Sequence, residues 1–338
     1  MNKLRKNRML ALFIALLGFV LMACESNEPS KTDENTELTE IEFMLDWIPN
    51  TNHTGVFVAK ELGYFEDAGF DVTIRRPPAG SATELVGLGE AEFGIHSQDS
   101  ISNRFAEGVP VTAVASIIEH NTAGILSKED AEIYTAADME GNSYGSVNEE
   151  TTLAMVQHIV EEDGGDFSKV EIIPSQADNI VIGFLNDMFD SGSVYYGWDG
   201  TRAETEGVPT NFFFYRDMAE ELDFHSPIII VNNDYLETNP EEVHNFIQAV
   251  KSGYQYAIEN PEKSADILIK NAPELKDQKE HIHASQEWIS KEYASDIDQW
   301  GYIDEERWDT FYKWLYENDL IEVDLTKKDL FTNEFLGD

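Results

Sequence analysis

Residues 41–75, IEFMLDWIPNTNHTGVFVAKELGYFEDAGFDVTIR, place a helical segment between two strand-like segments. The apolar run Ile41–Leu45 predicts one strand, and the alternating pattern of Phe70–Arg75 predicts another. Between them, Thr54–Leu62 predicts a short helix that ends at Gly63, because glycine readily adopts the left-handed conformation of a helix C-cap. Strand, helix and strand in this order are typical of a unit with parallel strands.

The same alternation continues along most of the chain. Further strands are expected at residues 93–95, 111–118, 144–147, 170–173, 193–196, 212–215 and 228–231. Further helices are expected at residues 82–88, 99–107, 151–161, 178–187, 240–254, 280–294 and 305–318. The chain has 338 residues, enough for about two domains at ~150 residues each. The pattern therefore predicts an α/β fold with mainly parallel sheets flanked by helices.

Charge and cysteine content exclude several classes of function. The chain holds 23 Lys and Arg against 65 Asp and Glu, for a net charge of −42. Nucleic-acid binding is excluded, because contacts to phosphate need clustered basic residues. A single cysteine, Cys24, excludes a disulfide framework and a cysteine-rich metal site. His281 and His283 have no evident third ligand, so no metal site is predicted.

The first 23 residues have the pattern of a signal peptide. Four basic residues come first: Lys3, Arg5, Lys6 and Arg8. The apolar run Met9–Met22 follows and is shorter than the ~20 residues of a membrane span. It leads into Leu21-Met22-Ala23-Cys24, which resembles a bacterial lipobox. We expect residues 1–23 to be removed, Cys24 to carry the lipid anchor and residues 24–38 to be a flexible tether to an extracytoplasmic body. The alternative is an ordinary secretory signal with a chance cysteine.

Several motifs resemble a known family. The segment Asp46–Gly55, DWIPNTNHTG, and the segment Gly63–Val72, GYFEDAGFDV, are similar to the opening of the pyrimidine-precursor-binding family. Members of that family are solute-binding proteins of thiamin-salvage ABC transporters, and they are related to hydroxymethylpyrimidine phosphate synthase. Similarity continues at residues 89–95, 108–111 and 301–320, in segments shared with sulfonate, nitrate and taurine binders.

The resemblance implies a fold, a partner and a place for the ligand. It implies a two-lobed periplasmic-binding-protein-like fold of type II, with lobe one at residues 39–135 plus 223–338 and lobe two at residues 136–222. The ligand is expected in the cleft between the lobes, and the partners are an ABC permease and its ATPase. We expect a monomer that touches the membrane through its lipid anchor only.

Four stretches are expected at the cleft, since ligands bind at the carboxyl ends of strands in such sheets. They are residues 46–53, 94–100, 145–151 and 195–199, and none contains Lys or Arg. Anions usually need a cationic partner, whereas aromatic faces with amide and carboxylate acceptors suit a flat ring that bears amino groups. The predicted ligand-binding residues are Asp46, Trp47, Asn50, His96, Gln98, Asn148, Glu149, Tyr195, Tyr196, Trp198 and Asp199.

The predicted ligand is a thiamin-derived aminopyrimidine, such as a formylaminopyrimidine or hydroxymethylpyrimidine. Strand alternation allows only one or two of Tyr195, Tyr196 and Trp198 to face it, and Trp47 could instead belong to the core. Riboflavin or another aromatic heterocycle is the first alternative, and a sulfonate, nitrate or taurine is the second.

A pyrimidine-processing enzyme is the alternative from a different class. The related synthase holds pyridoxal phosphate on a lysine of its first lobe and uses a cysteine cluster for iron. This chain has no lysine between Lys60 and Lys128, and its one cysteine lies in the lipobox. A Schiff base therefore cannot form there. We expect a protein that is not an enzyme and that carries no cofactor.

Overall fold

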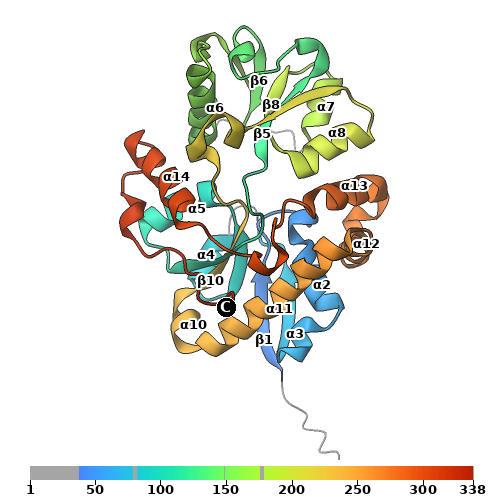
Figure 1. The fold of residues 1–338 in the computed structure, drawn as a ribbon, viewed down its shortest axis with the longest axis vertical. Coiled ribbons are helices and arrows are strands. Elements are labelled where there is room, and N and C mark those ends of the chain that lie inside the picture. Colours follow the sequence, from blue (N-terminus) through green and yellow to red (C-terminus); the bar gives the residue numbers. More distant parts are fainter. Residues whose placement is uncertain (1–37, 79–81, 148, 176–178, 338) are drawn as a thin grey trace, which may run out of the picture. The chain divides into compact units, whose positions relative to one another are not determined.

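The computed structural model describes residues 38–78, 82–147, 149–175 and 179–337 (Figure 1). The predicted signal peptide, Cys24 and nearly all of the tether lie outside these residues, as does Asn148. Within the described part of the chain, no helix is both long and apolar enough to span a bilayer.

Residues 38–338 contain two five-stranded sheets with the same strand pattern. The first sheet has the order β2-β1-β3-β10-β4 and the second has the order β7-β6-β8-β5-β9. The first consists of β1 (Thr39–Met44), β2 (Phe70–Arg75), β3 (Phe93–His96), β4 (Val111–Ser116) and β10 (Ile228–Asn232). The second consists of β5 (Ala123–Lys128), β6 (Ser143–Ser146), β7 (Glu171–Pro174), β8 (Ser191–Tyr195) and β9 (Thr210–Phe214).

Each sheet has four parallel strands and one antiparallel strand, so the predicted two-lobed α/β architecture is confirmed. The antiparallel strands are β5, which follows the passage from the first lobe to the second, and β10, which follows the return. The predicted lobe boundary at residue 135 leaves β5 in the first lobe, whereas its pairing with β8 and β9 places it in the second sheet. We accordingly propose that the chain crosses between lobes at residues 117–122 and 223–227.

Helices flank both sheets. The first lobe has α2 (Thr54–Glu61), α3 (Tyr64–Asp67), α4 (Ala82–Gly87), α5 (Gln98–Glu107), α10 (Asn233–Thr238), α11 (Pro240–Glu259), α12 (Pro261–Asn271), α13 (Lys279–Ile289) and α14 (Glu305–Glu317). The second has α6 (Glu150–Glu162), α7 (Ile180–Leu185), α8 (Thr201–Thr205) and α9 (Tyr215–Met218). Short helical turns are η1 (Thr51–His53), η2 (Glu129–Ala131), η3 (Ala137–Met139), η4 (Phe167–Lys169), η5 (Tyr196–Gly200), η6 (Glu220–Leu222), η7 (Pro273–Gln278), η8 (Ile297–Gln299) and η9 (Leu325–Lys327).

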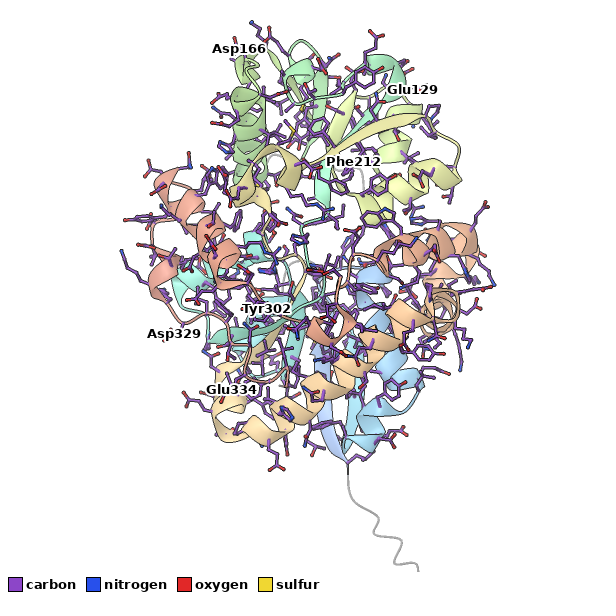
Figure 2. All side chains as sticks on the ribbon, in the orientation of Figure 1. Glu129, Asp166, Phe212, Tyr302, Asp329 and Glu334 are labelled. Carbon is purple, nitrogen blue, oxygen red and sulfur yellow. The ribbon has the colours of Figure 1, made fainter. Side chains whose placement is uncertain are left out.

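Local sequence explains where several helices begin and end. Gly63 and Gly108 adopt left-handed conformations, with φ of 80° and 81°, at the ends of α2 and α5. Helix α11 begins at Pro240, as the Asn-Pro-Glu pattern predicts. Helix α12 was not predicted, although Asn260-Pro261-Glu262 repeats the same start signal. Acidic side chains such as Glu129, Asp166, Asp329 and Glu334 lie exposed at the periphery (Figure 2).

Helix α11 closes the core of the first lobe. The ring of Phe246 stacks on Phe93 at 4.0 Å and on Phe65 at 5.0 Å between centroids. Phe43 and Phe70 contact the same ring, so strands β1, β2 and β3 all pack on one side chain of α11. Burial of such large aromatic side chains supplies much of the hydrophobic stabilisation of a lobe.

Helices α2 and α11 cross closely at two glycines. A Cβ atom added to Gly253 would lie 2.0 Å from the carbonyl oxygen of Gly55. The neighbouring Tyr254 donates a hydrogen bond to the Asn52 carbonyl at 2.6 Å, and Tyr293 donates one to the Thr51 carbonyl at 2.5 Å. Tyr254 of α11 and Tyr293 together therefore hold η1, the turn that follows Trp47.

We predict that Gly253→Ala destabilises the protein by about 2 kcal/mol. Overpacking costs roughly 1–3 kcal/mol and here meets rigid backbone, which outweighs the ~1 kcal/mol that alanine contributes to helix propensity. The measurement is urea unfolding, with Ser252→Ala on the same helix as the control. Unchanged stability of Gly253→Ala would contradict the close crossing.

Candidate functional site

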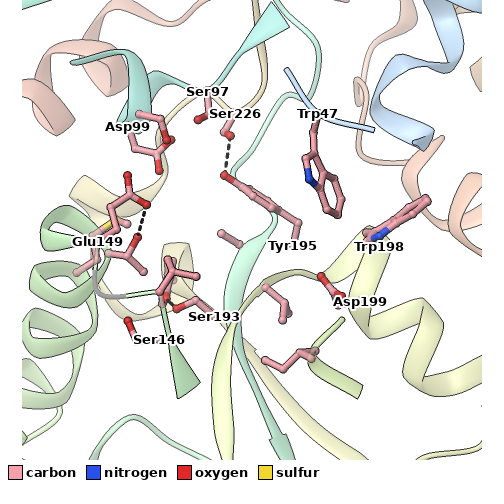
Figure 3. Close-up of a pocket in the computed structure, with 18 of the residues that line it drawn as sticks. Trp47, Ser97, Asp99, Ser146, Glu149, Ser193, Tyr195, Trp198, Asp199 and Ser226 are labelled. Atoms are coloured by element: carbon pink, nitrogen blue, oxygen red, sulfur yellow. Dashed lines mark hydrogen bonds between the residues drawn. The ribbon is translucent and has the colours of Figure 1, made fainter. Parts of the chain in front are cut away.

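A cavity of about 510 Å³ opens where both sheets present the carboxyl ends of their strands (Figure 3). Asp46 and Trp47 follow β1, while Ser97 and Asp99 follow β3. From the second lobe, Val147 and Glu149 follow β6, Ser193 and Tyr195 end β8, and Trp198 and Asp199 belong to η5. Remaining lining residues include Asn50, Asn52, Tyr144, Tyr215, Phe224, Ser226 and Pro227.

The cavity is acidic, and its described wall has no basic side chain. Four carboxylates line it: Asp46, Asp99, Glu149 and Asp199. Lys, Arg and His are absent from the lining residues in the described part of the chain. An anionic ligand would meet several negative charges here without a compensating cation, which is unfavourable. A ligand that donates hydrogen bonds or carries positive charge is favoured instead.

Aromatic rings occupy one side of the cavity. Trp47 is 38% exposed and is therefore not sealed into the core. Its ring meets Trp198 edge-on, with centroids 6.4 Å apart and planes at 77°. Tyr195 lies between this side and the acidic residues Asp99 and Glu149 (Figure 3), and its hydroxyl hydrogen-bonds Ser226 Oγ at 3.1 Å. A flat ring fits against such a set of faces and edges.

Helix α13 of the first lobe holds the turn that carries Trp198. His281 donates from Nε2 to the Trp198 carbonyl at 2.8 Å. Ser285 Oγ donates to the Gly197 carbonyl and also contacts Thr51 Oγ at 2.7 Å, so it links η5 to η1. The guanidinium of Arg202 lies 5.4 Å from the Trp198 ring centre. The aromatic side of the cavity is therefore tied to both lobes.

Asp46 is positioned by a histidine behind it. Nε2 of the fully buried His53 lies 2.8 Å from Asp46 Oδ1, and Nδ1 accepts from the Asn50 backbone N–H at 3.2 Å. This pair of contacts assigns the proton to Nε2, which donates to the carboxylate. Burial alone would raise the pKa of Asp46, but the hydrogen bond from His53 and the electrostatic interactions with His53 and His96 hold that pKa below its ordinary value. Asp46 is therefore an ionised acceptor.

Asp99 and Glu149 face each other on the other side of the cavity (Figure 3). Oδ1 of Asp99 is buried and has no hydrogen-bond partner among the described residues. Glu149 Oε2 accepts from Thr152 Oγ1 at 3.4 Å. Burial and the negative charge of Asp99 raise the pKa of Glu149. Nearby, Ser193 bridges the hydroxyls of Tyr144 and Tyr215.

Asp199 combines burial with a weak compensating charge. Burial raises the pKa of Asp199 to about 7, against the opposing charge of Arg202. Arg202 itself donates to Gln278 at 2.8 Å and lies 3.6 Å from Glu206, so much of its charge is shared with other groups. Near neutral pH, this carboxyl exists both as a donor and as an acceptor.

Comparison with known proteins shows the family to which this chain belongs. Residues 50–264 match the family model described as NMT1/THI5 like. The chain belongs to the NMT1/THI5-like family. The resemblance to a pyrimidine-precursor-binding family that the sequence motifs predict is thereby confirmed.

Relatives of this NMT1/THI5-like chain include both binding proteins and synthases. A formylaminopyrimidine-binding protein from Halalkalibacterium halodurans is 24% identical, with 96% of this chain and 98% of the relative covered. A 4-amino-5-hydroxymethyl-2-methylpyrimidine phosphate synthase from Legionella pneumophila is 25% identical over 70% of this chain and 75% of its own. Among solved structures, the periplasmic aliphatic sulphonate-binding protein SsuA from Escherichia coli has a TM-score of 0.65 at 14% identity and covers 88% of this chain and 99% of its own. The last comparison shows the shared fold.

Of the predicted site residues, the structure brings seven to the cavity of this family member. They are Asp46, Trp47, Asn50, Glu149, Tyr195, Trp198 and Asp199. Asn148 lies outside the described residues, and ligand contact by the seven stays a prediction.

Three predicted residues do not line the cavity. Gln98 is fully buried and joins the His225 backbone N–H at 2.7 Å to the Trp308 carbonyl at 3.1 Å. Tyr196 packs on Phe212, Phe214 and Trp288 and donates to Glu204, outside the cavity. His96 does not line the cavity, and its Nδ1 accepts from the Ser97 N–H at 3.0 Å.

Helical geometry explains both the errors and the omissions. Helix α5 begins at Gln98 and η5 begins at Tyr196, so strand alternation does not extend to these residues. The turn after β3 presents Ser97, Asp99 and Ser100 instead. All three lie in the predicted stretch 94–100, and Asp99 would have been found by treating residues 98–107 as helical from the start.

We predict that Asp199 makes stability fall as pH rises from about 4 to about 7. Because its folded pKa of about 7 lies above the ordinary value of 3.8, the folded state binds the proton more tightly in this window. The slope attributable to it is at most about 1.4 kcal/mol per pH unit, and it ends above the folded pKa.

The measurement compares unfolding free energies of the wild type and Asp199→Asn from pH 4 to pH 8. The difference between them should change across the window, while the exposed control Asp217→Asn should parallel the wild type. Parallel curves for Asp199→Asn and the wild type would contradict the raised pKa.

Proposed function

We propose that this protein is a substrate-binding protein that captures a thiamin-derived aminopyrimidine and delivers it to an ABC permease and its ATPase. In this proposal the chain is extracytoplasmic and anchored through a lipid on Cys24. The observation that carries the proposed ligand class is a cavity with exposed Trp47 and four carboxylates, and with no basic residue in its described wall.

The aromatic side of the cavity supports a flat ligand. The exposed ring of Trp47 and the edge-on ring of Trp198 offer surfaces against which a pyrimidine can stack. Each aromatic contact contributes about 0.5–1.5 kcal/mol beyond the burial of area. Because α13 fixes the turn that holds Trp198, little ordering is needed when the ring binds.

The acceptors support a ligand that bears amino groups. Asp46 is held ionised by His53, and Asp199 stands on the same side of the cavity as Trp47 (Figure 3). An amino group on the ring can donate to such carboxylates, and each charge-assisted hydrogen bond contributes roughly 1.5–3 kcal/mol. The relative from Halalkalibacterium halodurans carries the name of a formylaminopyrimidine-binding protein, which agrees with this chemistry.

A sulfonate or nitrate ligand fits this cavity poorly. SsuA shares the fold and is named for sulphonate binding, but fold similarity at 14% identity does not extend to the ligand. A sulfonate would need a cationic partner to offset its desolvation. The described wall of the cavity offers carboxylates where such a partner would be required.

Capture without catalysis is proposed, although several relatives carry the name of a synthase. A Schiff-base enzyme needs a lysine at its cofactor, and the chain has none between Lys60 and Lys128. No lysine lines the described wall of the cavity.

We predict binding of hydroxymethylpyrimidine or formylaminopyrimidine in calorimetric titrations of the mature protein. Riboflavin, taurine and nitrate serve as the comparison ligands, and mass spectrometry should recover the bound pyrimidine unchanged. Binding of taurine or nitrate with no response to either pyrimidine would contradict the proposal. Conversion of the pyrimidine into another compound would contradict the absence of catalysis.

We predict that Trp47→Ala weakens pyrimidine binding at least tenfold, a loss of ~1.4 kcal/mol. Since Trp47 is 38% exposed, the melting temperature of the ligand-free protein should hardly change. Tyr134→Ala removes another exposed aromatic side chain, one that does not line the cavity, and should bind like the wild type. A large loss of ligand-free stability in Trp47→Ala would instead assign that tryptophan to the core.

A further inference from the structure

Two carboxylates of the cavity come from different lobes and point toward one another. Asp99 belongs to α5 of the first lobe, and Glu149 caps the start of α6 in the second (Figure 3). The mutual repulsion of their charges contributes to the raised pKa of Glu149. Such a juxtaposition is unfavourable in the free protein, because like charges in a partly desolvated cleft repel.

Asp99 lines the cavity, and one oxygen of its carboxylate is an acceptor that the described residues leave unused. Its Oδ1 is buried and lacks a hydrogen-bond partner among the described residues. A buried carboxylate oxygen without a donor is destabilising, because it has lost its hydrogen bonds to water. The lining residues that the structure describes include no Lys, Arg or His to offset this charge. A donor supplied by the ligand would offset this charge.

The position of this pair relative to the aromatic rings is informative. Trp47 and Asp199 stand on one side of Tyr195, and Asp99 and Glu149 stand on the other (Figure 3). The cavity of about 510 Å³ falls within the roughly 300–1,000 Å³ typical of small-molecule sites. A single ring stacked at Trp47 therefore leaves room for a substituent that extends past Tyr195 toward the two acids.

We propose that Asp99 and Glu149 form a subsite for a protonated primary amine carried by the ring, so that an aminomethylpyrimidine is preferred over its N-formyl derivative. This inference rests on the proposed function, and it specifies the ring substituent. An ammonium group has three N–H donors and can bridge both carboxylates. A formamide has one N–H donor and would bring a carbonyl oxygen close to the same negative charges.

Bridging also couples the ligand to the arrangement of the lobes. With the subsite empty, the two charges oppose the approach of α5 to the start of α6. An ammonium between them replaces repulsion by two charge-assisted hydrogen bonds, one to each lobe. A neutral substituent leaves the repulsion between the two carboxylates in place. The approach of the two lobes around the ligand is then less favourable.

The test compares three ligands that share one ring. They are 4-amino-5-aminomethyl-2-methylpyrimidine, its N-formyl derivative and the hydroxymethyl analogue, titrated calorimetrically into the mature protein at pH 7. The amine should bind at least tenfold more tightly than the formamide. This preference should fall to within about twofold in the double variant Asp99→Asn/Glu149→Gln.

Two controls separate the subsite from general charge effects. Glu150→Gln removes the adjacent negative charge, which does not line the cavity, and should keep the tenfold preference. Raising the salt concentration should reduce the preference less than the double variant does, because direct hydrogen bonds from an ammonium group to Asp99 and Glu149 persist when longer-range attraction is screened. Melting temperatures of all variants identify any that fail to fold, and the single variants Asp99→Asn and Glu149→Gln then provide the same comparison.

The results distinguish this inference from the proposed function. Binding of the formamide or the hydroxymethyl analogue as tightly as the amine would overturn the amine subsite and leave pyrimidine capture intact. An amine preference that persists undiminished in the double variant would also overturn the assignment to Asp99 and Glu149. Failure of all three pyrimidines to bind would overturn the inference and the proposed function together.

Discussion

Negative charge dominates the cavity, whose wall has no basic side chain among the residues that the structure describes, and this charge constrains what can occupy the cavity. The four carboxylates meet this constraint in different ways. Asp46 receives a hydrogen bond from His53 and stays ionised, whereas burial raises the pKa of Asp199 to about 7. Opposite Glu149, Asp99 keeps a buried oxygen that has no partner in the described part of the chain. The ligand must supply what the wall lacks, namely hydrogen-bond donors or positive charge.

Close packing of helices in the first lobe holds His53 in the position from which it contacts Asp46. The crossing of α2 and α11 at Gly55 and Gly253 brings Tyr254 to the carbonyl of Asn52. Tyr293 holds the preceding carbonyl, and the resulting turn orients His53 toward Asp46. Backbone groups of a loop that would otherwise be loosely held are therefore satisfied by buried tyrosines. A substitution at Gly253 would therefore affect the cavity indirectly, through Tyr254 and the turn that it holds.

The sequence predicts the architecture well, because apolar residues recur with one period in strands and with another in helices. It also predicts Trp47 at the cavity, because this residue follows the first strand at its carboxyl end, where ligands bind in such sheets. It does not predict which residues of a strand-to-helix junction face inward, because the period changes at an unknown residue. Gln98 and Tyr196 were misplaced and Asp99 was overlooked for that reason. The place of β5 depends on antiparallel pairing with β8 and β9, which local patterns do not encode.

The contacts of α13 give the two sides of the cleft different mechanical properties. On the tryptophan side, buried hydrogen bonds from His281 and Ser285 join the lobes, and separating them exposes unsatisfied carbonyls. On the opposite side, Asp99 and Glu149 repel one another, so separation there relieves strain. The hydrogen bonds of α13 therefore hold the lobes together on the tryptophan side, whereas the two acids oppose the approach of α5 to the start of α6.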